Sequence, residues 1–247
     1  MSPVDGGNLG WIPVQIKPST RVRQRRSVHP PGQACDRPGR LNRNRITMII
    51  YLHGFRSSPA SEKARLLSDH LNRRGLGDRF WCEALPVSPR LAIESIECTI
   101  RSAASPPVLI GSSLGGYYAT YLAERHDLRA MLINPATDAA RILAPWVGRQ
   151  TNLYSGEVFD FTQAHIEELA ALWVPVLAKP ERFWLVVETG DELLDYREAL
   201  SRYAGARQTL YEGGDHSLRH FPELLDAIVE FAWPQLASPD RSMANQH

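Results

Sequence analysis

The sequence predicts an α/β fold in which a mostly parallel sheet is flanked by helices. Three observations support this class. Short apolar runs alternate with helical patterns from residue 48 onward, as in strands joined by crossover helices. Three of these runs are continuously apolar, which is typical of strands covered on both faces: 48–52, 107–110 and 183–187. The composition, with 43% hydrophobic and 22% charged residues, is that of a globular protein.

The individual elements follow from these patterns. Strands are expected at residues 48–52, 80–85, 107–110, 129–133, 183–188 and 207–212. Helices are expected at residues 61–73, 89–103, 114–126, 163–172, 196–204 and 222–232. Because strands and helices alternate, neighbouring strands should run parallel and be joined by right-handed crossovers.

One interval interrupts this alternation. No strand is predicted between Asn134 and Glu181, where several aromatic residues and one helix, 163–172, are found. We expect a small helical insertion over one end of the sheet, in place of a large lid. The alternative is a pair of crossover helices joined by a long loop.

Residues 1–47 differ in charge from the rest of the chain. They contain Lys17 and eight arginines against two aspartates, a net charge of +7, which leaves −6 for residues 48–247. Six of the 18 prolines also lie there, so we expect a disordered tail. Prolines and glycines argue against the amphipathic helix of a transit peptide. Three interpretations of these residues stay open. Translation starts at Met48 and they are not part of the native protein, they are a dispensable extension, or they form a functional arginine-rich arm.

The remaining boundaries and partner classes follow from composition. We expect one domain at 48–233 and a disordered C-terminal tail at 234–247. We do not expect nucleic acid as the main partner, because the acidic domain would repel phosphates and binding would depend on the basic tail alone. The longest apolar runs are far shorter than the roughly 20 residues of a membrane-spanning helix, and no secretory signal pattern is seen. We therefore expect no membrane span and a cytoplasmic protein.

A nucleophile motif follows the third predicted strand. The segment Gly111–Gly116 reads Gly-Ser-Ser-Leu-Gly-Gly and stands between an apolar strand and a helix. This is the context of a G-x-S-x-G turn, which needs glycines where strand and helix approach closely. The spacing places Ser113 at the central position, and Ser112 is the rival. The helix N-terminus behind the serine favours developing negative charge.

A serine nucleophile needs a base and a carboxylate that orients the base. His216 lies in a glycine-rich loop after the last predicted strand and is the candidate base. Asp191 follows the strand at 183–188 after a glycine turn and is the candidate carboxylate, with Asp195 in reserve. A metal pair of His216 with His220 lacks further ligands, so no metal and no cofactor are expected.

Two backbone donors are needed to hold the oxyanion of an acyl-transfer reaction. The N–H of Leu114, directly after the nucleophile, is the first candidate. The second is the N–H of Phe55, in the loop that ends the first strand. We interpret His53 in the same loop as a structural residue that braces it.

These linked motifs resemble the α/β-hydrolase superfamily and, more closely, the small bacterial YqiA-like esterases. The resemblance covers about 48–233, and its residues are Tyr51–Phe55 with Ser57–Pro59, Gly111–Ala119, Asn134–Ala136, Gly190–Glu192 with Leu194–Tyr196, and Gly213–His216. It implies a compact hydrolase with the α/β-hydrolase fold. It also implies hydrolysis of carboxylic esters or thioesters by Ser113, Asp191 and His216, whose order along the chain is that of α/β-hydrolases.

The substrate is the least defined part of this interpretation. The expected partner is a small-molecule acyl ester or thioester, and the oligomeric state stays open. Arg56, beside the oxyanion loop, and Tyr117, after the nucleophile turn, are candidate substrate contacts, Arg56 for an anionic group. Each also has a purely structural interpretation: Arg56 as a solvated surface residue and Tyr117 as a core residue. The alternative functions are a non-catalytic binding protein that keeps the hydrolase fold, and nucleic-acid binding through the basic N-terminal tail.

Overall fold

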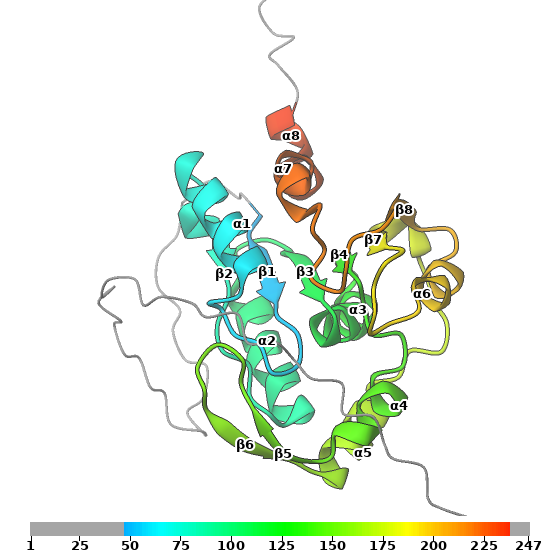
Figure 1. The fold of residues 1–247 in the computed structure, drawn as a ribbon. Helices are drawn as coiled ribbons and strands as arrows, with labels where there is room; N and C mark the ends of the chain where they lie inside the picture. Colours follow the sequence, from blue (N-terminus) through cyan, green and yellow to red (C-terminus); the bar gives the residue numbers. More distant parts are fainter. Residues whose placement is uncertain (1–46, 238–247) are drawn as a thin grey trace, which may run out of the picture. The chain divides into compact units, whose positions relative to one another are not determined.

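The computed structural model describes residues 47–237 (Figure 1). Within them, six parallel strands form one sheet in the order β2-β1-β3-β4-β7-β8. Their bounds are β1 (Ile49–Leu52), β2 (Phe80–Trp81), β3 (Val108–Ser112), β4 (Arg129–Ile133), β7 (Phe183–Glu188) and β8 (Arg207–Tyr211). The predicted fold class is confirmed.

Helices cover both faces of the sheet (Figure 1). One face packs against α1 (Glu62–Arg73) and α7 (Leu225–Ala232). The other packs against α2 (Pro89–Ser102), α3 (Leu114–His126) and α6 (Tyr196–Arg202). Adjacent strand residues point to opposite faces, so Ile49 enters the first core and Ile50 the second. This double burial explains why the central strands are continuously apolar.

The insertion between β4 and β7 is not purely helical, and that prediction is wrong. It contains α4 (Ala139–Leu143), α5 (Gln163–Ala171) and an antiparallel hairpin of β5 (Gly148–Thr151) and β6 (Val158–Phe161). Figure 1 shows the hairpin at the bottom of the view, next to α5. Most hairpin residues are exposed, so the strands lack the apolar alternation from which they could have been predicted.

Other differences concern the ends of elements. The strand predicted at 80–85 keeps only Phe80–Trp81, because the following residues leave the sheet edge for the loop before α2. The helix predicted at 222–232 begins as the 3-10 turn η4 (Phe221–Leu224), ahead of α7. Three further 3-10 turns are η1 (Gly77–Arg79), η2 (Ala144–Trp146) and η3 (Pro180–Arg182).

The predictions for the two tails are only partly covered by the structure. A short helix, α8 (Pro234–Ala237), occupies the start of the segment predicted to be disordered, and that part of the prediction is wrong. Trp233 just before it is buried, which explains why the chain stays packed there. The predictions for 1–46 and 238–247 lie outside the described residues. Across 47–237, no helix has the length and apolarity needed to cross a membrane.

Candidate active site

Ser113 stands alone between β3 and α3, in a backbone conformation that is unusual for a side-chain-bearing residue. Its φ is 55° and its ψ is −119°, which costs roughly 1–3 kcal/mol of strain. Backbone hydrogen bonds to the chain around the end of β4 hold it there. The Ser113 N–H donates to the Ile133 carbonyl at 3.0 Å, and the Ser113 carbonyl accepts from Ala136 at 3.1 Å. In a nucleophile turn, a strained conformation of this kind exposes the serine hydroxyl at the carboxyl end of the sheet.

The glycines around Ser113 are required by close backbone contacts. A Cβ on Gly111 would lie 2.2 Å from the Gly115 carbonyl oxygen. A Cβ on Gly116 would lie 2.7 Å from the Cβ of Pro135. Both distances are far below van der Waals contact. The approach of β3 to α3, and of α3 to the loop after β4, is therefore possible only because these side chains are absent.

The structure brings the three predicted side chains into one hydrogen-bonded chain. His216 Nε2 lies 3.1 Å from Ser113 Oγ, and His216 Nδ1 lies 2.8 Å from Asp191 Oδ2. The Asp191 side chain is only 2% exposed, and its Oδ1 also accepts the N–H groups of Leu193 and Leu194 at 2.9 Å. A carboxylate fixed in this way holds Nδ1 protonated and leaves Nε2 free to accept the serine proton.

Asp195 and Ser112, the two alternative candidates, have structural roles. Asp195 caps helix α6, since its carboxylate accepts the Arg197 N–H at 2.9 Å. Ser112 is a buried strand residue at the end of β3. Within 47–237, no group of three or more His, Cys, Asp or Glu residues is arranged to hold a metal ion.

The two predicted oxyanion donors lie beside Ser113. In the described part of the chain, the N–H groups of Phe55 and Leu114 donate no hydrogen bond to another protein group. A Cβ on Gly54 would lie 3.1 Å from the Ser113 Cβ, so the Gly54–Phe55 turn passes close to the serine. An oxygen bound near Ser113 can therefore meet two free donors.

His53 braces this turn, as predicted. Its Nε2 accepts the Leu85 N–H at 3.2 Å, so Nδ1 carries the proton and donates to the Gly54 carbonyl at 3.0 Å. Burial lowers the pKa of His53, while the Gly54 hydrogen bond opposes this, and the ring stays neutral. His53 thus joins the loop after β1 to the loop before α2.

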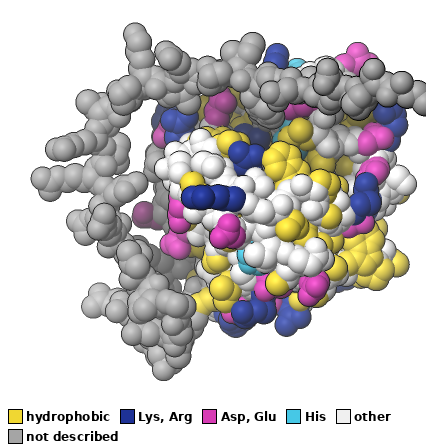
Figure 2. Space-filling view, turned by 60° about the horizontal axis from the view of Figure 1, so that its bottom comes forward, with side chains coloured by type: hydrophobic (Ala, Val, Ile, Leu, Met, Phe, Trp, Pro, Cys, Tyr) yellow, Lys and Arg dark blue, Asp and Glu magenta, His cyan; other side chains and the backbone are white. Residues whose placement is uncertain are grey.

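A cavity of about 340 Å³ opens beside the candidate donors. Its apolar wall includes Phe55, Leu85, Val87, Leu114, Tyr118 and Phe159. Its polar wall includes Arg56, Ser57, Asn152 and Glu157. A concave, mostly apolar cavity with a few polar groups is typical of a small-molecule site. Figure 2 brings forward the end of the molecule that carries the β5–β6 hairpin and shows hydrophobic side chains at its surface.

The two predicted substrate contacts have different outcomes. Tyr117 is 3% exposed, and its hydroxyl donates to the Leu169 carbonyl at 2.9 Å, so it is a core residue and that prediction is wrong. Its neighbour Tyr118 lines the cavity instead. Successive helix residues differ in direction by about 100°, and only the packing of α3 decides which one faces the cavity.

Arg56 does line the cavity, but it is also tied to the hairpin. Its Nε donates to the Thr151 carbonyl at 2.9 Å, and its guanidinium lies 5.4 Å from the centre of the Trp146 ring. Asn152, which sequence reasoning missed, donates to the Ser57 carbonyl at 2.8 Å. These bonds seat the β5–β6 turn on the oxyanion loop and close one side of the cavity.

Comparison with known proteins places the chain in a family. The model of the "Uncharacterised protein family (UPF0227)" matches residues 48–233. The chain belongs to this family. The resemblance to the YqiA-like proteins, drawn above from the motifs, is therefore confirmed. The matched range contains every candidate site residue of this UPF0227 chain.

Solved structures show that this UPF0227 chain has the α/β-hydrolase fold. A candidate hydrolase from Agrobacterium vitis S4 is similar with a TM-score of 0.60 at 19% identity, over 77% of this chain and 89% of that one. Mouse alpha/beta hydrolase domain-containing protein 10 gives 0.58 at 17%, over 79% and 98%. A monoacylglycerol lipase from Paleococcus ferrophilus gives 0.54 at 15%, over 76% and 96%.

Proposed function

We propose that this chain is a serine hydrolase that cleaves carboxylic esters through an acyl-enzyme on Ser113. The observation that carries the proposal is the chain of hydrogen bonds from Ser113 through His216 to the buried Asp191. A hydroxyl is a weak nucleophile at neutral pH unless a base is in direct contact with it. The ester-cleaving neighbour named above, a lipase, supports the same reaction class by analogy of fold.

The reaction follows from the geometry. His216 Nε2 takes the hydroxyl proton as Ser113 Oγ attacks the acyl carbonyl carbon, and Asp191 stabilises the imidazolium. The carbonyl oxygen becomes an oxyanion and accepts the N–H groups of Phe55 and Leu114. The C–O bond to the leaving group breaks, and the alcohol departs with the proton from His216. Water activated by His216 then releases the acid and restores Ser113.

The cavity supports an assignment for the acyl group. Phe55 and Leu114, whose N–H groups are the candidate oxyanion donors, line it together with Val87. We assign the acyl chain to this cavity, because its lining includes the neighbours of Ser113. Hydrolysis of a thioester would follow the same steps with a thiol as the leaving group, and it is the alternative reaction within this proposal.

Hydrolysis of p-nitrophenyl esters from acetate to palmitate tests the proposal on the full chain. We expect Ser113→Ala and His216→Ala to lose activity by several orders of magnitude, and Asp191→Asn to lose less. Ser112→Ala is the matched control and should stay active. Turnover retained in purified Ser113→Ala would overturn the nucleophile assignment. A folded parent without activity on any ester or thioester would overturn the reaction class.

A further inference from the structure

A fully buried carboxylate lies beneath the loop that carries His216, and the proposed reaction does not use it. Glu188 is the last residue of β7, and its side chain is 0% exposed. A buried charge is tolerated only where hydrogen bonds replace water. Its partners therefore show what it holds in place.

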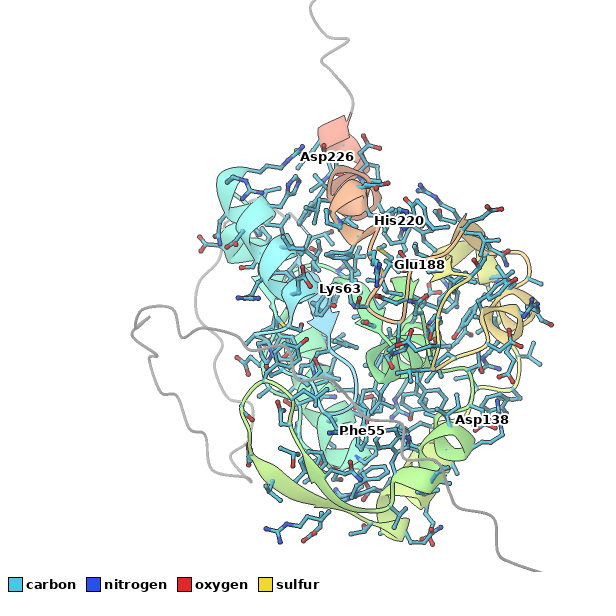
Figure 3. All side chains as sticks on the ribbon, in the orientation of Figure 1. Phe55, Lys63, Asp138, Glu188, His220 and Asp226 are labelled. Atoms are coloured by element: carbon cyan, nitrogen blue, oxygen red, sulfur yellow. The ribbon has the colours of Figure 1, made fainter. Side chains whose placement is uncertain are left out.

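All the close partners of this carboxylate belong to the His216 loop. Glu188 Oε2 accepts the Asp215 N–H at 2.6 Å. Glu188 Oε1 accepts the His220 N–H at 3.0 Å and His220 Nδ1–H at 2.7 Å. Figure 3 shows Glu188 and His220 directed towards each other, with Lys63 nearby. The carboxylate thus holds the loop on both sides of His216.

Asn134 holds the same loop by donating hydrogen bonds to backbone carbonyl groups of the loop. It directly follows β4 and has a φ of 38°, a conformation that asparagine tolerates better than most residues. Its Nδ2 donates to the carbonyls of Asp215 at 3.2 Å and of His216 at 3.3 Å. Its Oδ1 accepts the Glu188 N–H at 3.1 Å. Asn134 therefore joins the backbone of Glu188 to the backbone of His216 itself.

The loop lies so close to the carboxylate that it needs a glycine. A Cβ on Gly214 would stand 1.8 Å from Glu188 Oε2, and Gly214 has a φ of 72°. Burial raises the pKa of Glu188, but the hydrogen bonds from His220 and Asp215 outweigh it and hold the pKa below its ordinary value. The Glu188 side chain is therefore a carboxylate, and both of its oxygens accept hydrogen bonds from the loop.

We propose that Glu188 and Asn134 are positioning residues that hold the His216 imidazole within reach of Ser113. The proposal rests on the function proposed above, in which His216 is the base. Proton transfer requires the 3.1 Å separation of His216 Nε2 and Ser113 Oγ, and a displacement of about 1 Å can cost on the order of 100-fold in rate. Glu188 contacts Asp215 and His220, and Asn134 contacts the carbonyls of Asp215 and His216. Both side chains therefore act on the reaction through the loop.

The principal variant is Glu188→Gln, which keeps the size of the side chain. Its NH₂ group must face an N–H donor of either Asp215 or His220, so one loop contact is lost. We expect kcat for p-nitrophenyl esters to fall on the order of ten- to 100-fold, with KM changed less than about twofold. Asn134→Asp, which tolerates the positive φ and keeps the acceptor for the Glu188 N–H, should act in the same direction.

The matched control is Glu97→Gln. Glu97 lies on α2, its side chain is 13% exposed, and it accepts from a histidine, His126, at 3.0 Å and from Arg125 at 2.8 Å. It is a second carboxylate–histidine pair, and it belongs to a different part of the molecule from the His216 loop. We expect its substitution to lower Tm and to leave kcat unchanged. A role of Glu188 in stability alone would give the same pattern as Glu97→Gln.

A second readout does not depend on turnover. The proton between His216 Nδ1 and Asp191 should give a strongly downfield NMR resonance, with matching ring ¹⁵N shifts. We expect this resonance to weaken or move in Glu188→Gln and Asn134→Asp, and to persist in Glu97→Gln. Where Glu188→Gln does not fold, Asn134→Asp carries the test.

The outcomes separate this inference from the proposed function. Folded Glu188→Gln and Asn134→Asp with parental kcat and an unmoved His216 resonance would overturn the positioning role, whatever the parent hydrolyses. A parent that lacks esterase activity but whose His216 resonance moves in both variants would remove the proposed function and keep the positioning role. Loss of kcat with a moved resonance in both variants, against an unaffected Glu97→Gln, supports the inference.

Discussion

Gly115 in the first turn of α3 lies directly against Leu52 at the end of β1: a Cβ on Gly115 would stand 2.0 Å from the Leu52 carbonyl oxygen. This contact brings the start of α3 next to the loop that follows β1. It thereby brings the Leu114 and Phe55 N–H groups to the same side of Ser113. The spacing of the candidate oxyanion donors depends on the absence of a side chain at residue 115.

Gly115→Ala should therefore impair both stability and activity. The added methyl group meets backbone rather than a flexible side chain, so α3 and β1 must move apart, at a cost of roughly 1–3 kcal/mol or more in unfolding free energy. We expect ester hydrolysis to fall on the order of 100-fold or more, as for loss of one oxyanion donor. Urea denaturation and kcat/KM measure the two effects.

Gly75→Ala is the control for this prediction. Gly75 has a φ of 70° but no neighbouring heavy atom that a Cβ would meet within 4 Å. The substitution should cost roughly 1–2 kcal/mol for the backbone conformation alone and leave kcat/KM unchanged. Equal activities of Gly115→Ala and Gly75→Ala would contradict the role given to the Gly115–Leu52 contact.

The cavity should determine preference for acyl chain length. Ala84 lines it and is exposed, so Ala84→Trp adds bulk without removing a core contact. We expect kcat/KM for long-chain esters to fall about tenfold or more relative to acetate, because the apolar chain loses its site. Ala104→Trp, at an exposed position outside the cavity, should leave the ratio as in the parent. An unchanged profile in Ala84→Trp would place the acyl chain elsewhere.

The β5–β6 turn should loosen when Asn152 is removed. Its side chain donates to the Ser57 carbonyl and accepts the N–H groups of Tyr154 and Ser155. Asn152→Ala should speed proteolytic cleavage at the turn and raise KM for esters several-fold, while Tm shifts little because the turn is exposed. Asn72→Ala, at an exposed position of α1, is the matched control. Cleavage rates equal to the parent would show that other contacts hold the turn.

The buried Glu188 should make stability sensitive to acid. Its pKa is below the ordinary value, so its contribution is complete above about pH 4.3, the unfolded value, and is lost as pH falls through the lower folded value. We expect the difference in unfolding free energy between the parent and Glu188→Gln to be largest at neutral pH and to shrink below about pH 4.3. Denaturation at several pH values between 7 and 2 measures it, and a constant difference would contradict it.

The sequence was sufficient to predict the strands after which Ser113, Asp191 and His216 lie. Each follows a predicted strand of a parallel sheet, and the carboxyl ends of such strands share one edge. The glycine spacing around Ser113 then predicts the close approach of β3 and α3, which the structure shows. These inferences succeed because apolar periodicity and glycine positions are local properties that the chain carries without its partners.

Packing between distant segments decided the rest. The hairpin could not be predicted, because its exposed strands are held mainly by the loop after β1, about 95 residues away in sequence. Whether Tyr117 or Tyr118 lines the cavity depends on how α3 is rotated about its axis against the core. The contact of Asn134 with the His216 backbone spans 82 residues. The sequence by itself determined the strands, their glycine turns and hence the edge where the three side chains meet. Only the tertiary structure decided which side chains line the cavity and support His216, because those choices depend on contacts that exist only after the chain has folded.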